Sequence, residues 1–200
     1  MYKSAKARGK KVIGGILCGL LMAGQLLLPQ APGMQEVLAA PFTMGTQNHW
    51  AEQYMRKLFD EGIMRGDING NMNPDRKITR AEFVSIINRA FGYKVSGKNP
   101  FKDVKGTEWY ANDLSIAYQQ GYFSGSGKNM AEPMSNLTRE QAVTLLCRNL
   151  NLEGENRESF RFQDSRNFQS WSREAINAAT QKNVVAGYKD GTFRPSNSIT

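Results

Sequence analysis

The stretch Ile78-Thr79-Arg80-Ala81-Glu82 decides the fold, because it recurs as Leu137-Thr138-Arg139-Glu140-Gln141 and begins a third time at Ile199-Thr200. Both complete copies have the T-x-x-E/Q form of a capping box. In this motif the threonine oxygen accepts the third helical N–H, and the Glu or Gln side chain accepts the threonine N–H. Each copy therefore predicts the first turn of an α-helix that follows a loop.

Three tryptophans upstream extend the match into a repeat of about sixty residues. Trp50, Trp109 and Trp171 align without a gap on glycines 16 residues later and prolines 24 residues later. The glycines are Gly66, Gly125 and Gly187, and the prolines are Pro74, Pro133 and Pro195. Repeats of this size bury their apolar faces by packing on one another.

Each repeat is expected to contain a helix, a glycine-marked loop and a second helix. In the first repeat the apolar spacing predicts one helix over 48–60 and another after Thr79. The apolar face of that second helix is predicted to hold Phe83, Ile86, Ile87 and Ala90, with Ala142, Leu145, Leu146 and Leu150 as counterparts after Thr138. The fold class predicted is all-α, with three tandem helix-loop-helix repeats over 40–95, 96–155 and 156–200.

Residues 1–39 have the composition of a secretory signal peptide. Basic residues at 3–11 precede a charge-free apolar run over 12–28, and the small-residue site Val37-Leu38-Ala39-Ala40 follows. We expect this segment to engage the translocase and to be cleaved after Ala39 or Ala40. The alternative is an uncleaved membrane anchor, which the glycines of the apolar run disfavour.

Export limits what the net charge of +8 implies. Half of that charge lies in residues 1–39, and an exported protein meets no chromosome, so no nucleic-acid partner is expected. Cys18 lies in the apolar run, which leaves Cys147 alone in the rest of the chain without a disulfide partner. Cys147 is expected to be a small buried apolar side chain.

Together the motifs resemble the S-layer homology (SLH) repeat, over about residues 42–200. The resemblance rests on the first capping stretch and on these segments: His49-Trp50-Ala51, Gly62-Ile63-Met64-Arg65-Gly66, Asn73-Pro74 and Gly187-Tyr188-Lys189-Asp190-Gly191-Thr192-Phe193-Arg194-Pro195. It implies a pseudo-threefold assembly in an exported bacterial protein of the cell wall or S-layer. It also implies non-covalent anchoring to secondary cell-wall polymer, often carrying pyruvylated amino sugars, or to another peptidoglycan-linked glycan, in grooves between adjacent repeats.

Arg80 and Arg139 are the first candidate ligand-binding residues. A cation at the first helical position opposes the helix dipole, so an anion or acidic partner is expected to compensate it; a structural ion pair with a neighbouring repeat is the alternative. The resemblance places the arginine of the T-R-A-E motif in the groove. There it would pair bidentately with a carboxylate, while free N–H groups of the helix start receive the same anion.

Three further groups of residues are candidates, each with a structural alternative. Trp50, Trp109 and Trp171 would lie against a sugar face, or belong to the core. Gly66, Gly125 and Gly187 would permit close backbone approach, or form a turn with positive φ. The carboxylates of Asp67 and Asp190 would accept sugar hydroxyls, or cap their loops.

The repeats also depart from the family pattern. Met44 stands where Asp103 and Asp164 follow their phenylalanines, and Ser124-Gly125-Ser126-Gly127-Lys128 replaces the G-Y-x-D-G loop. The third repeat stops at Thr200, the residue expected to cap its second helix. We therefore expect that helix to be missing, and the chain to be part of a longer protein.

No catalytic or metal site is expected in these residues. The segment 67–78 has Met72 and Ile78 where an EF-hand needs Gly and Glu, and His49 is the only histidine. No cofactor is predicted. The longer protein would be a polysaccharide or peptidoglycan hydrolase with its catalytic domain beyond residue 200, or a lattice-forming S-layer protein that associates with itself. A basic module that adheres to any anionic polymer is the remaining alternative.

Overall fold

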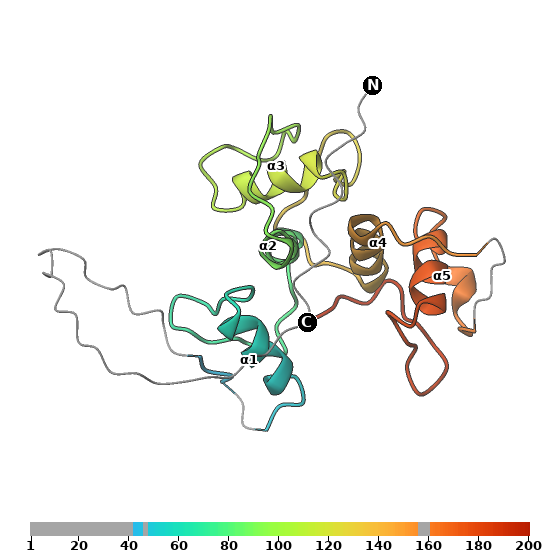
Figure 1. The fold of residues 1–200 in the computed structure, drawn as a ribbon. Coiled ribbons are helices and arrows are strands. Elements are labelled where there is room, and N and C mark those ends of the chain that lie inside the picture. Colours follow the sequence, from blue (N-terminus) through green and yellow to red (C-terminus); the bar gives the residue numbers. More distant parts are fainter. Residues whose placement is uncertain (1–41, 46–47, 156–160) are drawn as a thin grey trace, which may run out of the picture. The chain divides into compact units, whose positions relative to one another are not determined.

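The computed structural model describes residues 42–45, 48–155 and 161–200, and these residues form helices and loops without a β-strand (Figure 1). The elements are α1 (Glu52–Asp60), α2 (Arg80–Phe91), α3 (Ala111–Gln119), α4 (Arg139–Leu150), a 3-10 helix η1 (Ser165–Asn167) and α5 (Arg173–Gln181). The all-α prediction is confirmed. The predicted signal peptide lies outside the described residues, and among the described helices none is both long and apolar enough to span a membrane.

Both predicted capping boxes are formed. The Thr79 hydroxyl accepts the Glu82 N–H at 3.3 Å, and the Glu82 carboxylate accepts the Thr79 N–H at 2.8 Å. Thr138 and Gln141 repeat this arrangement, with the Thr138 N–H donating to Gln141 Oε1 at 3.0 Å. The sequence therefore located the start of α2 and of α4 to the residue.

The first helix of the first repeat begins later than predicted. In the first repeat α1 begins at Glu52 rather than near residue 48, and Trp50 precedes it. The residues before α1, α3 and α5 are Ala51, Tyr110 and Ser172, and none of them makes a side-chain cap hydrogen bond. Ala51 and Tyr110 are not capping residues, and the Ser172 hydroxyl donates to Glu140 Oε2 at 2.8 Å instead of capping α5. These helix starts therefore lack the capping motif that marks α2 and α4.

The second helix of one repeat packs on the first helix of the next repeat. The contacts join α2 to α3 and α4 to α5, which lie side by side in Figure 1. Val84 of α2 and Leu114 of α3 are fully buried in the first of these interfaces. Cys147 of α4 and Ile176 of α5 lie in the second interface, so the predicted burial of Cys147 is confirmed.

The buried face of α2 is rotated from the predicted one. Ala90 is exposed and Phe83 and Ile86 are half-buried, whereas Ala81, Val84, Ser85, Ile87 and Asn88 are buried. Polar partners on α3 explain the two buried polar side chains, since the Asn88 amide donates to Asp113 Oδ1 at 2.9 Å and the Ser85 hydroxyl donates to the same carboxylate. The spacing of apolar residues alone does not predict which polar side chains are buried.

A closed ring of three backbone hydrogen bonds joins the residues that precede the three threonines. Ile78 N–H donates to Ile199 O at 3.1 Å, Ile199 N–H donates to Leu137 O at 3.0 Å, and Leu137 N–H donates to Ile78 O at 3.0 Å. The Leu137 side chain is fully buried, and the other two side chains pack against the same cluster. The three repeats thus hold equivalent places in the ring, which is the local form of the threefold relation that the resemblance implies.

Candidate functional site

The backbone N–H groups at the start of α2 already donate hydrogen bonds within the protein. Arg80 N–H donates to Ser135 O at 3.0 Å and Ala81 N–H donates to Pro133 O at 2.9 Å, both in the second repeat. At the start of α4, Arg139 N–H and the next N–H donate in the same way to carbonyls of the third repeat, at 2.8 and 3.0 Å. The expectation that free N–H groups receive an anion there is wrong, because the adjoining repeat fills them.

The side chains of Arg80 and Arg139 also reach the next repeat. Arg80 is 5% exposed; its Nε donates to Ala131 O at 2.8 Å, and its guanidinium lies 5.1 Å from the Phe123 ring centroid. Arg139 Nη2 donates to Ala186 O at 2.7 Å. In the described part of the chain no carboxylate forms an ion pair with either arginine. The alternative of a structural ion pair is therefore not found in the described residues, and both arginines donate to neutral carbonyls instead.

One groove brings residues of all three repeats together. It has a volume of about 380 Å³ and we call it the Arg80 groove. Its lining comes from α2, the second-repeat loop, α4 and the start of the third repeat: Arg80, Phe123, Ser124, Gly125, Ser126, Gln141, Thr144, Leu145, Arg148 and Trp171. Two arginines and no carboxylate line it, so the lining is positively charged beside an exposed indole.

Burial acts on the Arg80 guanidinium and lowers its pKa, while the charges of Glu132 and Asp103 oppose that shift from outside the lining. Arginine stays charged at any pH where the protein is folded. Arg148 is exposed at the mouth of the groove. The groove therefore combines one fixed, buried cation with one accessible cation, an arrangement that suits a carboxylate.

A second groove is built from matching positions. It has a volume of about 230 Å³, and we call it the Trp109 groove. Glu82, Ser85, Ile86 and Arg89 of α2 take the places that Gln141, Thr144, Leu145 and Arg148 hold in the Arg80 groove, and Trp109 takes that of Trp171. Its charge differs, because the carboxylate of Glu82 lies in the lining beside Arg76, its partner at 2.6 Å. Three arginines still outnumber that one carboxylate, so both linings carry an excess of positive charge, and the Arg80 groove is the one of the two that has no carboxylate in its lining.

Sequence reasoning missed Arg89 and Arg148. Each stands nine residues after the arginine of its own capping stretch, so the repeat register contained the information. Neither belongs to an obvious motif, and a charged residue in the last turn of a helix is ordinarily a solvated one. Arg148 becomes part of a groove because Trp171 of the third repeat lines the same groove as α4.

The three tryptophans are exposed, which overturns their interpretation as core residues. The exposed fractions are 75% for Trp50, 59% for Trp109 and 46% for Trp171. Trp109 and Trp171 each line a groove. Trp50 lines neither groove and lies beside His49, with ring centroids 5.6 Å apart.

Gly66, Gly125 and Gly187, which hold the same position in the three repeats, are all approached closely by other residues. A Cβ on Gly66 would lie 2.5 Å from the Gly70 carbonyl carbon, and one on Gly187 would lie 2.6 Å from the Phe162 ring. Of the three, only Gly125 has a positive φ, +78°. The turn with positive φ that all three repeats share lies four residues earlier, at Gly62, Gly121 and Asn183.

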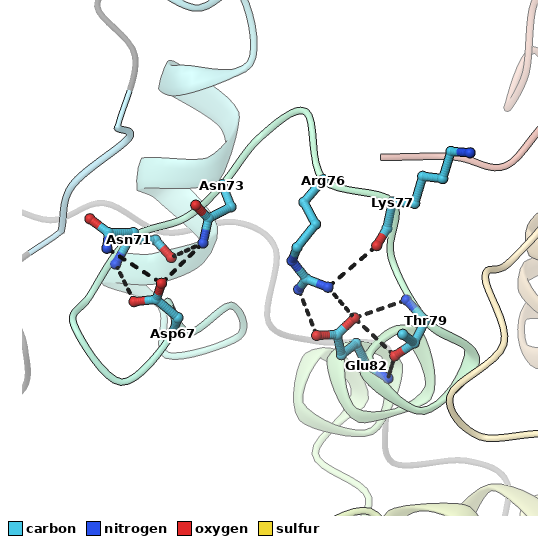
Figure 2. Close-up of polar contacts among 7 residues, drawn as sticks. All are labelled: Asp67, Asn71, Asn73, Arg76, Lys77, Thr79 and Glu82. Carbon is cyan, nitrogen blue, oxygen red and sulfur yellow. Dashed lines mark hydrogen bonds and ion pairs between the residues drawn. The ribbon is translucent and has the colours of Figure 1, made fainter.

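Asp67 and Asp190 cap their own loops. Asp67 accepts the N–H groups of Asn71 and Asn69 at 3.0 and 2.9 Å, and Figure 2 shows the side chains of Asn71 and Asn73 closing on it. These bonds, the Asn71 N–H foremost, lower the pKa of Asp67. The Thr192 hydroxyl and Arg194 lower the pKa of Asp190 in the same manner. Neither aspartate lines the Arg80 groove or the Trp109 groove.

The Glu82 carboxylate combines a helix cap with an ion pair, as Figure 2 shows. Burial opposes its ionisation, but hydrogen bonds from Arg76 and Thr79 outweigh this and lower the pKa of Glu82. A lowered pKa in the folded state means that the ionised group stabilises the fold above its unfolded pKa, about 4.3. That stabilisation is lost as the pH falls through the folded value.

We expect Glu82→Gln to reduce the free energy of unfolding at pH 7 by at most about 1 kcal/mol, because Arg76 is half-exposed. Glutamine keeps the cap, as Gln141 does in the second repeat. Urea unfolding at pH 7 and at about pH 3 should show the difference from wild type closing on acidification. Gln141→Glu is the matched control, since Ser135 stands in place of Arg76 there. A gap that persists at low pH would contradict this account.

The described residues hold no cluster of three side chains suited to a metal ion. What the site offers is recognition: arginines for carboxylates, an exposed indole for an apolar sugar face, and hydroxyl and amide groups for polar substituents. The side chains that supply them come from four segments of the chain, which belong to three different repeats.

A family model described as the S-layer homology domain matches residues 46–84, 100–143 and 161–200. The chain is 33% identical over 138 residues to the Surface-layer 125 kDa protein of Lysinibacillus sphaericus, covering 69% of this chain and 12% of that protein. It is 29% identical over 183 residues to Exoglucanase XynX of Acetivibrio thermocellus (88% and 17%) and 30% identical over 149 residues to Middle cell wall protein of Brevibacillus brevis (72% and 14%). The chain spans less than a fifth of the length of each of these curated relatives.

Proposed function

The chain belongs to the S-layer homology domain family, and from that premise we propose that its grooves bind an acidic secondary cell-wall polymer. Membership places the protein at the cell surface, in the cell wall or S-layer, where SLH domains anchor proteins to the wall. The finer proposal concerns which residues bind and which chemical group they bind. The ligand is a glycan with carboxylate-bearing, pyruvylated amino sugars.

The Arg80 groove carries this proposal. Arg80 and Arg148 line a pocket without any acidic side chain, and Trp171 exposes 46% of its surface there. A guanidinium binds a carboxylate through two parallel hydrogen bonds. The ketal-linked pyruvate supplies that carboxylate, and the sugar ring supplies an apolar face for the indole. Ser124, Ser126 and Gln141 are within the same lining for ring substituents.

Arg139 serves as the corresponding residue for the third repeat. Its guanidinium contacts the Phe193 and Tyr188 rings, 4.8 and 5.1 Å from their centroids. Because its Nη2 is committed to Ala186, fewer of its donors face a ligand. We therefore assign the main anion contact to the Arg80 groove.

The activity of the whole protein is a separate matter. Relatives that share these repeats are named as surface-layer proteins and as glycan-cleaving enzymes, and the match covers only a small part of each. We propose that the repeats attach the protein to the wall and take no part in catalysis. A lattice-forming or hydrolytic domain would then lie elsewhere in the protein.

Co-sedimentation with purified cell-wall sacculi tests the proposal. Matched sacculi stripped of secondary polymer by hydrofluoric acid are the control. The protein is expected to pellet with intact sacculi only, and to remain bound above about 0.3 M salt because buried pairs are poorly screened. Equal pelleting with stripped sacculi, or release by that salt, would point to peptidoglycan or to charge alone. Failure to pellet with either preparation would also overturn the proposal.

A further inference from the structure

Asn69 and Gly70 form the one Asn-Gly pair in the sequence, and they lie in the loop of the first repeat. Asn69 is exposed and Ile68 before it is 97% exposed, so water reaches this turn freely. Asn69 holds the place that Asp190 holds in the third repeat, 19 residues after the tryptophan. The first repeat therefore has a side-chain amide where the third repeat has a carboxylate.

The fold requires the glycine of this pair. Gly70 has φ +82°, a backbone conformation that a side chain would strain, and Gly191 at the same place in the third repeat has φ +77°. A Cβ on Gly66 would lie 2.5 Å from the Gly70 carbonyl carbon, so the two backbones are also in close contact. The residue after Asn69 therefore carries no side chain that could shield its own backbone nitrogen.

The side-chain amide of Asn69 is not held, unlike those of the other two asparagines of the loop. The Nδ2 atoms of Asn71 and Asn73 donate to Asp67 Oδ2 at 3.3 and 3.2 Å (Figure 2). Within the described residues Asn69 bonds to Asp67 through its backbone N–H, at 2.9 Å, and its side chain makes no hydrogen bond. Asn73 is followed by Pro74, which has no N–H. Asn69 is thus the reactive asparagine of the three.

We propose that Asn69 is a site of spontaneous deamidation through a cyclic imide formed with Gly70. The Gly70 nitrogen gives its proton to water and bonds to Asn69 Cγ; the Cγ–Nδ2 bond breaks, and ammonia leaves with a proton taken from water. A water molecule then opens the imide. Attack at Cγ yields aspartate, and attack at the main-chain carbonyl carbon yields isoaspartate. Because the Gly70 N–H donates to Asp67 O at 2.9 Å, the reaction follows opening of this turn.

The isoaspartyl product lengthens the backbone where the loop holds the residues that precede α1. Its main chain runs through the former side chain, which adds a methylene group before Gly70. Gly70 O accepts the Thr43 N–H at 3.2 Å and the Thr43 hydroxyl at 3.3 Å, and Thr43 O accepts the Met72 N–H at 2.8 Å. Displacing Gly70 breaks these bonds, so the isoaspartyl form holds Thr43 less firmly.

Incubation of the purified protein at mildly alkaline pH, in water labelled with a heavy oxygen isotope, tests the site. The tryptic peptide over residues 66–76 contains all three asparagines, and its fragmentation in a mass spectrometer identifies the converted residue. We expect residue 69 to gain labelled oxygen, with conversion at Asn71 at least about tenfold slower because of a higher barrier. No residue of this peptide lines the Arg80 groove, so the result does not depend on polymer binding.

Asn69→Gln is the matched control for the reaction. It keeps the amide, but its longer side chain closes a ring less readily, so conversion should be at least about tenfold slower. Conversion at Asn71 as fast as at Asn69 would overturn the site. So would an unconverted folded protein after a time in which the synthetic peptide of residues 66–76 is converted.

Hydrogen exchange tests the structural consequence. Asn69→Asp supplies the aspartyl product without lengthening the backbone. The Thr43 and Met72 amides should exchange at least about tenfold faster in the isoaspartyl form than in Asn69→Asp, because their bonds then open locally. The amides of α4 should exchange equally in both. Unchanged exchange at Thr43 in the isoaspartyl form would show that the loop does not hold this segment.

Discussion

Replacing Arg80 and Arg148 together with alanine is expected to lower the affinity for polymer-bearing sacculi on the order of 10²- to 10⁴-fold. Hydrogen bonds to charged groups contribute about 1.5–3 kcal/mol each, and each 1.4 kcal/mol is about a factor of ten in binding. The reason for the large effect is that no other cation lines this groove. Binding isotherms from co-sedimentation at several protein concentrations give the measurement.

The single variants separate recognition from folding. Arg80 is buried and bonds to Ala131 O, so its loss also disturbs the contact between repeats. Arg148 is exposed, and Arg148→Ala should reduce affinity while leaving the unfolding curve unchanged. Arg166→Ala removes the same charge from an exposed position outside the groove and is the matched control.

Arg148→Lys distinguishes a bidentate site from adhesion by charge. A lysine keeps the charge but not the planar pair of donors, so weakened binding is expected. Binding by Arg148→Lys equal to that of wild type, together with equal losses for Arg148→Ala and Arg166→Ala, would show that the protein adheres through its net charge alone.

Leu137→Ala is expected to be the most destabilising substitution at the ring of backbone hydrogen bonds. The Leu137 side chain is fully buried where the side chains of Ile78 and Ile199 also pack. Truncating a buried leucine costs about 2–5 kcal/mol, through lost burial and the cavity left behind. Unfolding in urea, followed by circular dichroism, gives the change in free energy of unfolding.

Met134→Ala is the matched control for Leu137→Ala. Met134 is an apolar side chain in the same loop, but it is 60% exposed. Its replacement should alter stability by no more than about 0.5 kcal/mol. If both variants lost the same stability, the ring would not be a packing centre of the fold.

Regularities within one repeat were predictable from sequence. Thr79 and Thr138 marked the starts of α2 and α4, because a capping box is a local arrangement whose two partners are three residues apart. The starts of α1, α3 and α5 have no such partner, so the first helix was predicted too long and Trp50 was placed inside it. Its exposure follows from the turn that precedes the helix.

Features that depend on two repeats were only partly predictable. The sequence singled out Arg80 as a cation at an unfavourable position, but not the carbonyls of Ala131 and Ser135 that surround it. Those carbonyls lie more than fifty residues away, in a loop whose path is set by α3 and α4. The role of Arg148 depends likewise on Trp171 of the next repeat.

The hydrogen-bond ring sets the order in which this chain can fold. In a linear array each repeat needs only its neighbour, so contacts stay local and assembly can start anywhere. Here the bond between residues 78 and 199 spans more than half of the chain. Chain entropy opposes such a long closure until the intervening helices have shortened the path. We therefore expect the first repeat to complete its contacts only once the third repeat is in place, so that the three repeats unfold and refold as one cooperative unit.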